Sequence, residues 1–313
     1  METSSRSPED PDFPLALLDL GKKGLAPCTW LRTRGPWPAP LGVAIVGTRR
    51  PDDASVAFAR TLAAEVADTG LAVWSGGAIG IDRAAHEGAM ERGGRTVVVS
   101  PSGLDNPYPK EHRSLFERVL ATGGTIVSPF ADGAPPISGA FHRRNSVLAA
   151  LTIATVVVQA GEQSGARATA RAARKLERPV YVVPHAPWQE IGRGCALELI
   201  DGAHAIVSSS TLLARLNDDL NPGEIRRSVM SGRAAPGPAA APSREHARTH
   251  ALHELDAIAK RVFEAIGEVP IHMDDLCERT ALSAGAVTAA LLTLTLGAVV
   301  VEAPAGYYRL STI

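Results

Sequence analysis

Six short apolar runs alternate with helical patterns between residues 41 and 207, and this alternation constrains the fold more than any other feature of the sequence. The segments between the runs repeat apolar side chains at helical spacing, as Phe58, Leu62 and Val66 do. Strands that alternate with amphipathic helices form a doubly wound, mostly parallel sheet with right-handed crossovers. We therefore expect a Rossmann-like α/β domain over residues 41–216. Its predicted strands are 43–46, 71–74, 96–99, 125–127, 154–158 and 180–183, and its predicted helices include 82–92, 112–121, 145–151 and 166–176.

The rest of the chain divides into three parts. Residues 1–40 are rich in proline and show little periodicity, so we expect an extended N-terminal lead-in. Residues 217–250 are rich in Pro, Ala and Gly, which predicts a flexible linker. Residues 251–313 have the pattern of three helices followed by two short strands, which predicts a small C-terminal winged-helix domain. The predicted elements of that domain are helices 252–266, 274–280 and 284–296 and strands 298–302 and 307–310.

Charge and cysteine content limit the function classes. The formal net charge is −1, so a nucleic-acid site would have to be a local cluster of basic residues. Arg is more frequent than Lys, which suits forked contacts to phosphate. Cys28, Cys195 and Cys277 have neither metal-binding nor redox spacing. The first residues are acidic and interrupted by prolines, and no apolar run is long enough to span a membrane, so we expect a cytoplasmic protein.

Ligands of an open parallel sheet gather beyond the carboxyl ends of its strands, where four loops have phosphate-binding character. The first loop combines Gly47 and the Thr48 hydroxyl with the guanidiniums of Arg49 and Arg50. The alternative is a tight turn with solvated arginines, because the neighbouring residues 52 and 53 are both Asp and could pair with them.

The second loop, SGGAIGID over residues 75–82, is rich in glycine. Gly76 and Gly77 would allow close approach of a ligand and point backbone N–H groups outward. The alternative is a βα turn in which Asp82 is the N-cap of the next helix. We interpret Asp82 as structural, and His86 as a packed helix histidine rather than a general base.

The third and fourth loops add aromatic and basic side chains. Phe141, Arg143, Arg144 and Asn145 lie at a predicted loop-to-helix junction and offer a base-stacking surface beside a backbone clamp. A packed Phe with surface arginines is the alternative.

In the fourth loop, Ser164 and Gly165 open a helix, as phosphate sites do. Arginines then follow on one helical face, which could track a nucleic-acid backbone or simply be solvated. They are Arg167, Arg171, Arg174 and Arg178.

Several motifs of other function classes are missing. The sequence has no GxxxxGK[ST] nucleotide loop, no GxSxG nucleophile and no arranged carboxylate pair. His246, His250 and His253 have spacing compatible with a metal on one helical face, but their place beside the linker favours a solvated helix start. We therefore expect no cofactor, no metal and no catalysis.

Taken in order, the loops resemble the DprA (Smf) family of DNA-processing proteins. The resemblance covers residues 41–207 and rests on the combination of segments, since each alone is unspecific. The segments are VAIVGTRRP, SGGAIGIDRAAHEGAM, GLDNPYPKEH, FHRRNSVLAAL, AGEQSGARATA and GRGCALELIDGA. At residues 52–55 the chain has DDAS where the family has T-P-Y-G.

This resemblance implies a homodimeric single-stranded DNA-binding protein that protects incoming DNA and loads the recombinase RecA in natural transformation. It places DNA contacts on Thr48, Arg49, Phe141, Arg143, Arg144, Ser164 and Gly165. From the loops themselves we add Gly47, Arg50, Gly76, Gly77, Asn145, Arg167 and Arg171 as candidate DNA-binding residues.

Two other functions remain open. One is an enzyme, a nucleoside monophosphate phosphoribohydrolase similar to the LOG type, although Glu162 lies on the wrong side of the glycine turn for that chemistry. The other is a partner-recognition scaffold whose winged helix is the active part. The predicted recognition helix, 283–296, contains no Arg, Lys, Asn or Gln, so we expect it to contact protein rather than duplex DNA.

Overall fold

The structure is a computed structural model that describes residues 3–37, 39, 41–219, 257–267, 271–296, 300–303 and 307–310. The chain divides into two compact units, Met1–Ala235 and Pro236–Ile313. Most of the predicted linker and all three of His246, His250 and His253 lie outside the described residues.

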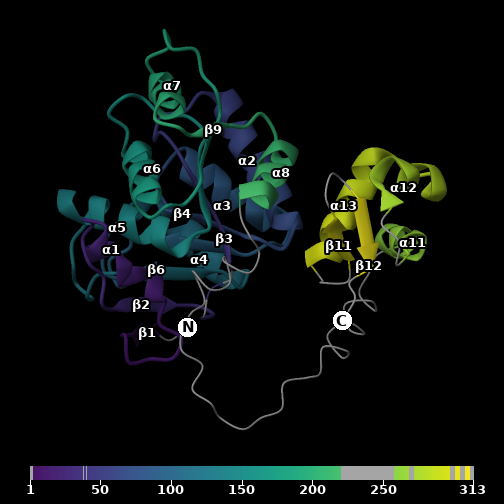
Figure 1. Cartoon of the computed structure of the whole chain (residues 1–313). Helices are drawn as coiled ribbons and strands as arrows, with labels where there is room; N and C mark the ends of the chain where they lie inside the picture. Colours follow the sequence, from purple (N-terminus) through teal and green to yellow (C-terminus); the bar gives the residue numbers. More distant parts are fainter. Residues whose placement is uncertain are drawn as a thin grey trace. The chain divides into compact units, whose positions relative to one another are not determined.

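A nine-stranded sheet forms the centre of the first unit (Figure 1). Seven strands from β6 to β9 are parallel to one another, and β1 and β2 continue the sheet in antiparallel fashion. The predicted Rossmann-like, mostly parallel sheet is confirmed. In spatial order the strands are β1 (Thr3–Arg6), β2 (Leu31–Arg34), β6 (Thr125–Ser128), β5 (Thr96–Val99), β4 (Ala72–Ser75), β3 (Gly42–Val46), β7 (Ala154–Val157), β8 (Val180–Val182) and β9 (His204–Ala205).

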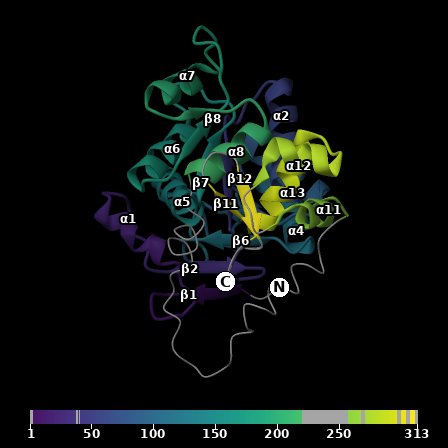
Figure 2. The same ribbon diagram turned by 45° about the vertical axis from the view of Figure 1, so that its right-hand side comes forward.

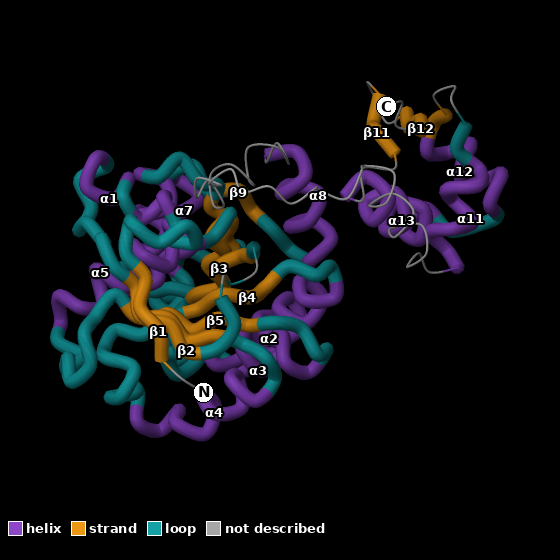
Figure 3. The backbone as a smooth tube through the Cα atoms, turned by 90° about the horizontal axis from the view of Figure 1, so that it is seen from below, coloured by secondary structure: helices purple, strands orange, loops and turns teal. Residues whose placement is uncertain are grey.

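Helices cover both faces of this sheet, as Figures 1 and 3 show. Alternate side chains of β3 enter different cores: Val43 and Ile45 pack on one face, and Ala44 and Val46 on the other. One face is covered by α2 (Asp53–Asp68), α3 (Ile81–Glu91), α4 (Arg113–Ala121) and α8 (Ser209–Asp219). The other is covered by α1 (Asp19–Lys22), α5 (Ser138–Leu151), α6 (Gly165–Lys175) and α7 (Arg193–Ile200).

The N-terminal region differs from the expected extended lead-in. β2 pairs with β6, and β1 pairs with β2, so both strands complete one edge of the sheet (Figure 2). Between them, Phe13, Leu17 and Leu20 are buried in the core under α5. The physical reason is that β6 would otherwise present an unpaired edge. The first unit therefore includes β1 and β2 and does not begin at residue 41.

Helix α5 also begins earlier than expected. The sequence predicts a helix from Asn145, whereas the structure has it from Ser138, so Phe141 to Arg144 lie within the helix and not at a loop junction. Successive helical side chains point in different directions, which separates residues that are neighbours in the sequence.

The second unit has the predicted winged-helix elements around its own core, which includes Val262, Leu276 and Leu291. An additional strand, β10, completes a small antiparallel sheet in the order β10–β12–β11. Residues 304–306, between the two predicted strands, lie outside the described residues. The elements are α11 (Ala257–Ala265), β10 (Ile271–His272), α12 (Met273–Thr280), α13 (Ala284–Leu296), β11 (Val300–Ala303) and β12 (Tyr307–Leu310).

Candidate nucleic-acid interface

A pocket of about 920 Å³ lies at the carboxyl ends of β3 and β7. These strands are neighbours in the sheet, but the chain continues from β3 to one side and from β7 to the other. Such a switch point leaves an open crevice in a doubly wound sheet, because the connections diverge from it. The pocket is lined by Val46, Gly47, Thr48, Arg49, Ala78, Asp82, Phe141, Arg144, Asn145, residues 161–166, Thr169, Pro187, Trp188, Glu190 and Arg193.

The first loop lies against α3 and α5. A Cβ at Gly47 would meet the Ile81 side chain at 2.5 Å, so the glycine permits close packing of the loop on α3. The exposed Arg49 guanidinium lies 5.2 Å from the centre of the Phe141 ring, a cation–π contact that holds its charge at the pocket.

The two aspartates after this loop do not neutralise it. Asp52 is the N-cap of α2 and accepts hydrogen bonds from the Ser55 N–H (2.7 Å) and from the Gln159 amide. The Ser55 N–H and then the Gln159 amide hold the pKa of this carboxyl below its ordinary value. Among the described residues, neither Asp52 nor Asp53 forms an ion pair with Arg49 or Arg50.

The glycine-rich second loop faces inward rather than outward. The buried Asp82 carboxylate accepts hydrogen bonds from the N–H groups of Gly76 (3.1 Å) and Ala78 (3.3 Å), so these donors face Asp82 and not a ligand. The N-cap of α3 is Gly80 at φ +85°, and not Asp82. Gly77, at φ +71°, is not part of the pocket lining.

Gly76 makes room for a buried arginine. A Cβ there would lie 1.0 Å from Nη1 of Arg144, so only glycine allows the guanidinium to lie over the loop. That Nη1 is 3.9 Å from Oδ2 of Asp82, which is an ion pair but not a hydrogen bond. Burial lowers the pKa of Arg144 and raises that of Asp82, and the opposite charge of each partner opposes both shifts. Within the described chain no protein acceptor is hydrogen-bonded to the guanidinium, so its donors are available to an anion in the pocket.

Arg143 points elsewhere. Its guanidinium lies 5.5 Å from the centre of the Phe130 ring. Burial raises the pKa of the Cys28 thiol, and the positive charge of Arg143 opposes that rise. Arg143 is not part of the pocket lining. The structure therefore separates the two adjacent arginines that the sequence grouped together.

The pocket's aromatic and amide side chains are fixed by neighbours. The Phe141 ring meets Tyr108 edge-on, with ring centres 5.6 Å apart. Asn145 Nδ2 donates to the Gly165 carbonyl at 3.2 Å, which ties α5 to the start of α6. Ser164 is the N-cap of α6, and its hydroxyl accepts from the Ala166 N–H at 3.2 Å. Ser164, Gly165 and Ala166 line the pocket, so the positive end of the α6 dipole lies at it.

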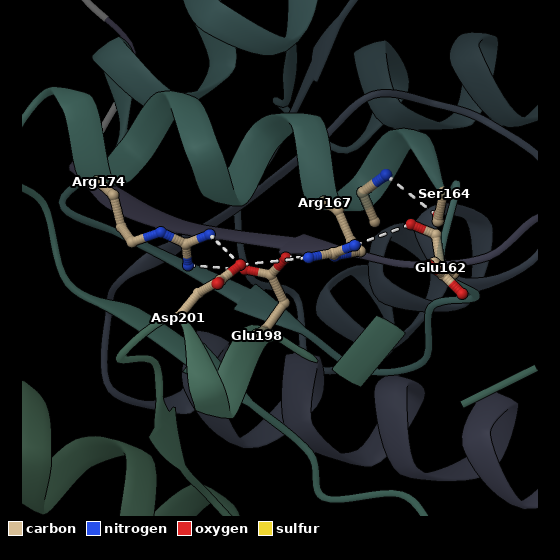
Figure 4. A network of polar contacts seen from close by, with 7 residues as sticks. Glu162, Ser164, Arg167, Arg174, Glu198 and Asp201 are labelled. Atoms are coloured by element: carbon tan, nitrogen blue, oxygen red, sulfur yellow. Dashed lines mark hydrogen bonds and ion pairs between the residues drawn. The ribbon is translucent and has the colours of Figure 1, made fainter. Parts of the chain in front are cut away.

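The arginines along α6 are mostly bound to other parts of the protein (Figure 4). Arg167 Nε and Arg174 Nη1 each donate to the fully buried Glu198 at 2.6 Å, and both guanidiniums also reach Asp201. Arg178 donates to two backbone carbonyls at the end of α5. Arg171 is exposed. Of the predicted stripe, Arg171 alone is free of such a partner in the described chain.

This network also reaches the loop that precedes α6. Arg167 Nη1 donates to the Glu162 carbonyl at 2.9 Å, so Glu198 on α7 holds Arg167, which in turn holds the loop 161–165. Arg167 is a pocket-positioning residue in this geometry.

The sequence analysis did not predict that the stretch after β8, which includes Trp188 and Arg193, contributes to the pocket lining. Trp188 lies on the segment between β8 and α7, Arg193 is the first residue of α7, and Arg193 Nε is 3.6 Å from the Glu162 carboxylate. A sequence signal existed, because this segment also follows a parallel strand and contains one of only four tryptophans.

His86, on the helix that follows the second loop, is packed in the interior. His86 is buried, its pKa is lowered to about 3, mainly by burial, and its Nδ1 bonds the Thr96 hydroxyl at 2.7 Å. It is therefore a neutral packed residue, as expected. Across the described residues, no three His, Cys, Asp or Glu side chains are grouped to hold a metal ion. In the same part of the chain no helix is long and apolar enough to cross a bilayer.

Comparison with known proteins gives consistent results. The chain matches the family model of DNA recombination-mediator protein A over residues 5–217 and that of the DprA winged helix domain over residues 234–306. It is 31% identical to Protein Smf of Synechocystis sp., over 97% of this chain and 79% of that protein. A putative DNA processing protein DprA of Mycobacterium tuberculosis is 39% identical over 56% of this chain and 45% of its own length. The fold is also similar to that of a Helicobacter pylori DNA processing protein A studied for its single-stranded DNA binding mode, with a TM-score of 0.61, 32% identity, and coverage of 71% of this chain and 98% of that one.

Proposed function

The chain belongs to the DNA recombination-mediator protein A family, and on that premise we propose that it binds single-stranded DNA, without turnover, at the pocket between β3 and β7. The observation that carries this proposal is the combination of Arg49, Arg144 and the α6 N-terminus around one pocket, beside the Phe141 ring. Basic groups that follow a backbone and aromatic rings that stack bases are what a protein needs to bind a single strand.

In this proposal the pocket residues have different tasks. Phosphate is contacted by five residues, which are Thr48, Arg49, Arg144, Ser164 and Gly165. Asn145 orients the start of α6. Phe141 stacks a base, and the exposed Arg50 follows the backbone. Gly47 and Gly76 provide close packing, and Gly77 shapes the turn beneath Arg144. Arg143 and Arg167 support the pocket from behind, and Arg171 contributes charge at its margin.

The proposal extends to the partners of the protein. We infer a homodimer that protects incoming DNA and hands it to RecA during natural transformation and related DNA processing. The support is the family membership, since relatives in this family are named DNA processing proteins.

A nucleotide-cleaving enzyme of the LOG type fits the pocket less well. Its glutamate would have to face the glycosidic bond, but the Glu162 side chain is 56% exposed and lies next to Arg193. His86 cannot replace it as a base, because it is fully buried.

The winged-helix unit has a separate role in the proposal. The exposed positions of α13 include Ala284 and Gly285, whose side chains have no hydrogen-bonding group, and Thr288, whose hydroxyl donates to the Ala284 carbonyl at 2.8 Å. We therefore assign this unit to protein contacts. Deletion of residues 251–313 should leave duplex affinity unchanged, and a measurable loss would contradict the assignment.

Fluorescence anisotropy with labelled oligo-dT and the matching duplex, over a salt series, tests the proposal. We expect preference for the single strand and a steep salt dependence. Arg144→Lys should weaken binding, because lysine keeps the charge but loses the forked donors. Arg215→Ala, an exposed arginine on α8, is the matched control and should bind like the wild type. Absence of oligo-dT binding at low salt would overturn the proposal, and nucleoside monophosphate cleavage would then be the activity to assay.

A further inference from the structure

Trp188 is exposed to an unusual degree for a large aromatic side chain. Its relative exposure is 84%, the highest among the exposed large hydrophobic residues of the described chain. Burial of an indole in the core is strongly favoured by its large apolar area, so a tryptophan held in water commonly serves a binding surface.

The segment that carries Trp188 is ordered by its own hydrogen bonds. The Gln189 N–H donates to the Ala186 carbonyl, and the Gly192 N–H donates to the Gln189 carbonyl, both at 3.0 Å. A Cβ at Gly192 would lie 2.4 Å from the His185 side chain, so the second turn packs tightly on the first. The indole is thus presented from a defined backbone.

This segment also borders the phosphate-binding loop. A Cβ at Gly194 would lie 2.3 Å from the Gly161 carbonyl oxygen, and Arg193 Nε lies 3.6 Å from the Glu162 carboxylate. Trp188 lines the same pocket as Ser164, Gly165 and Arg49. The indole therefore lies at the rim of a cavity whose donors suit an anion.

We infer that Trp188 stacks a nucleobase of the strand whose phosphate lies at the start of α6, as a second base-binding position beyond Phe141. The inference rests on the proposed function. An aromatic rim around a pocket that contains guanidinium donors suits a polymer in which bases and phosphates alternate, and base stacking on a protein aromatic is tolerant of sequence. The lining also contains the carboxylates of Asp82, Glu162 and Glu190, of which Asp82 faces Arg144 and Glu162 faces Arg193. Arg49 forms no ion pair within the described chain, so its charge at the pocket favours a phosphate-bearing occupant over a protein partner.

The test uses the full chain with Trp188→Ala, Trp188→Phe and, as a matched control, Ile258→Ala, which removes an exposed apolar side chain from the other unit. Affinity is measured for oligo-dT and for an abasic strand of the same length. We expect Trp188→Ala to lose about tenfold for oligo-dT, with Trp188→Phe retaining most of the affinity. The abasic strand should bind the wild type and Trp188→Ala equally.

Intrinsic fluorescence gives an independent readout. Trp30, Trp37 and Trp74 remain in Trp188→Ala, so the difference between the two proteins isolates the emission of Trp188. Oligo-dT should quench that difference, and the abasic strand should not.

Three outcomes would overturn the inference. Unchanged oligo-dT affinity in Trp188→Ala would do so while leaving the proposed function intact. An equal loss for the abasic strand would mean that Trp188 orders the loop instead of stacking a base. A change in the sedimentation of the free protein, without a change in DNA affinity, would identify a protein interface. Failure of the wild type to bind oligo-dT would instead contradict the proposed function itself.

Discussion

Arg49 and Arg144 at the pocket differ from Arg167 and Arg174 on α6 in the carboxylates that surround them. Arg49 lies over an aromatic ring, and Arg144 is 3.9 Å from its single carboxylate. Arg167 and Arg174 instead share Glu198 and Asp201, with hydrogen bonds as short as 2.6 Å (Figure 4). A guanidinium whose donors are already bound has little to offer a phosphate, because it would have to exchange one anion for another.

The comparison shows that an arginine's role depends on acidic groups contributed by distant parts of the chain. Helical spacing places the α6 arginines on one face, but their partners come from α7, more than twenty residues later. The pocket arginines bind the ligand in our account, and the α6 arginines hold the site in shape.

The largest effect should come from removing the centre of the α6 network. Glu198→Ala removes the buried member of the two carboxylates that Arg167 and Arg174 share and leaves them only the more exposed Asp201, so we expect a loss of about 3 kcal/mol in the free energy of unfolding. Urea denaturation measures it. Glu190→Ala, on the exposed segment beside the pocket, is the control and should change stability by less than about 0.5 kcal/mol. An unchanged unfolding midpoint in Glu198→Ala would contradict the structural role of the network.

The next effect is a pH dependence of the free energy of unfolding, caused by the buried His86. The pKa of His86 is lowered to about 3 in the folded protein, by burial first and then by His112 and Arg144. The unfolded chain, with an ordinary histidine pKa near 6.5, binds the proton first as pH falls. Stability contributed by the neutral ring is therefore complete above about pH 6.5 and is lost toward pH 3.

Between pH 7 and pH 5 this linkage amounts to about 2 kcal/mol. Urea denaturation at the two pH values measures it, with His86→Gln as the comparison, since glutamine does not titrate. If both proteins lose stability equally, the buried ring does not cause the dependence.

A smaller effect is expected at the pocket surface. Arg49→Ala removes an exposed guanidinium and its contact with Phe141, so it should weaken oligo-dT binding about tenfold, or ~1.4 kcal/mol, with little change in stability. An anisotropy titration with labelled oligo-dT at one fixed salt concentration is sufficient to measure this loss of affinity. If the variant binds oligo-dT as tightly as the wild type, Arg49 is not part of the binding surface.

The smallest effect should come from Arg171→Ala. This side chain is exposed on α6 and lies outside the pocket lining, so it adds only screened, longer-range attraction. We expect a loss of less than about threefold in oligo-dT affinity at physiological salt. A tenfold loss in the same titration would extend the binding surface along α6.

Local patterns were sufficient to predict most of the fold. Six of the seven parallel strands were found because each is a short apolar run bounded by turns, whereas the two-residue β9 was not. Strand β2 was missed because its sequence, LRTR, carries two arginines and no apolar alternation long enough to recognise. Its stability comes from pairing with the edge of β6, far away in the sequence. The start of α5 was missed because Ser138 to Arg144 has no helical apolar period.

The candidate site was predictable to a similar degree. Its loops could be located because the carboxyl ends of parallel strands converge on one edge. The directions of the side chains could not be predicted, because the separation of Arg143 from Arg144 depends on helical geometry and on Phe130. The inward turn of the glycine loop was hidden for the same reason, because Asp82 acts across six residues on the Gly76 N–H.

The salt dependence of oligo-dT binding, compared between Arg49→Ala and Arg174→Ala, tests most directly whether the pocket arginines, and not the α6 arginines, hold the strand. Each lost phosphate contact on a single strand should reduce the slope of log affinity against log salt by about 0.7. We predict that reduction for Arg49→Ala and an unchanged slope for Arg174→Ala. The opposite pattern, with the reduction in Arg174→Ala alone, would contradict the account and place the strand on α6.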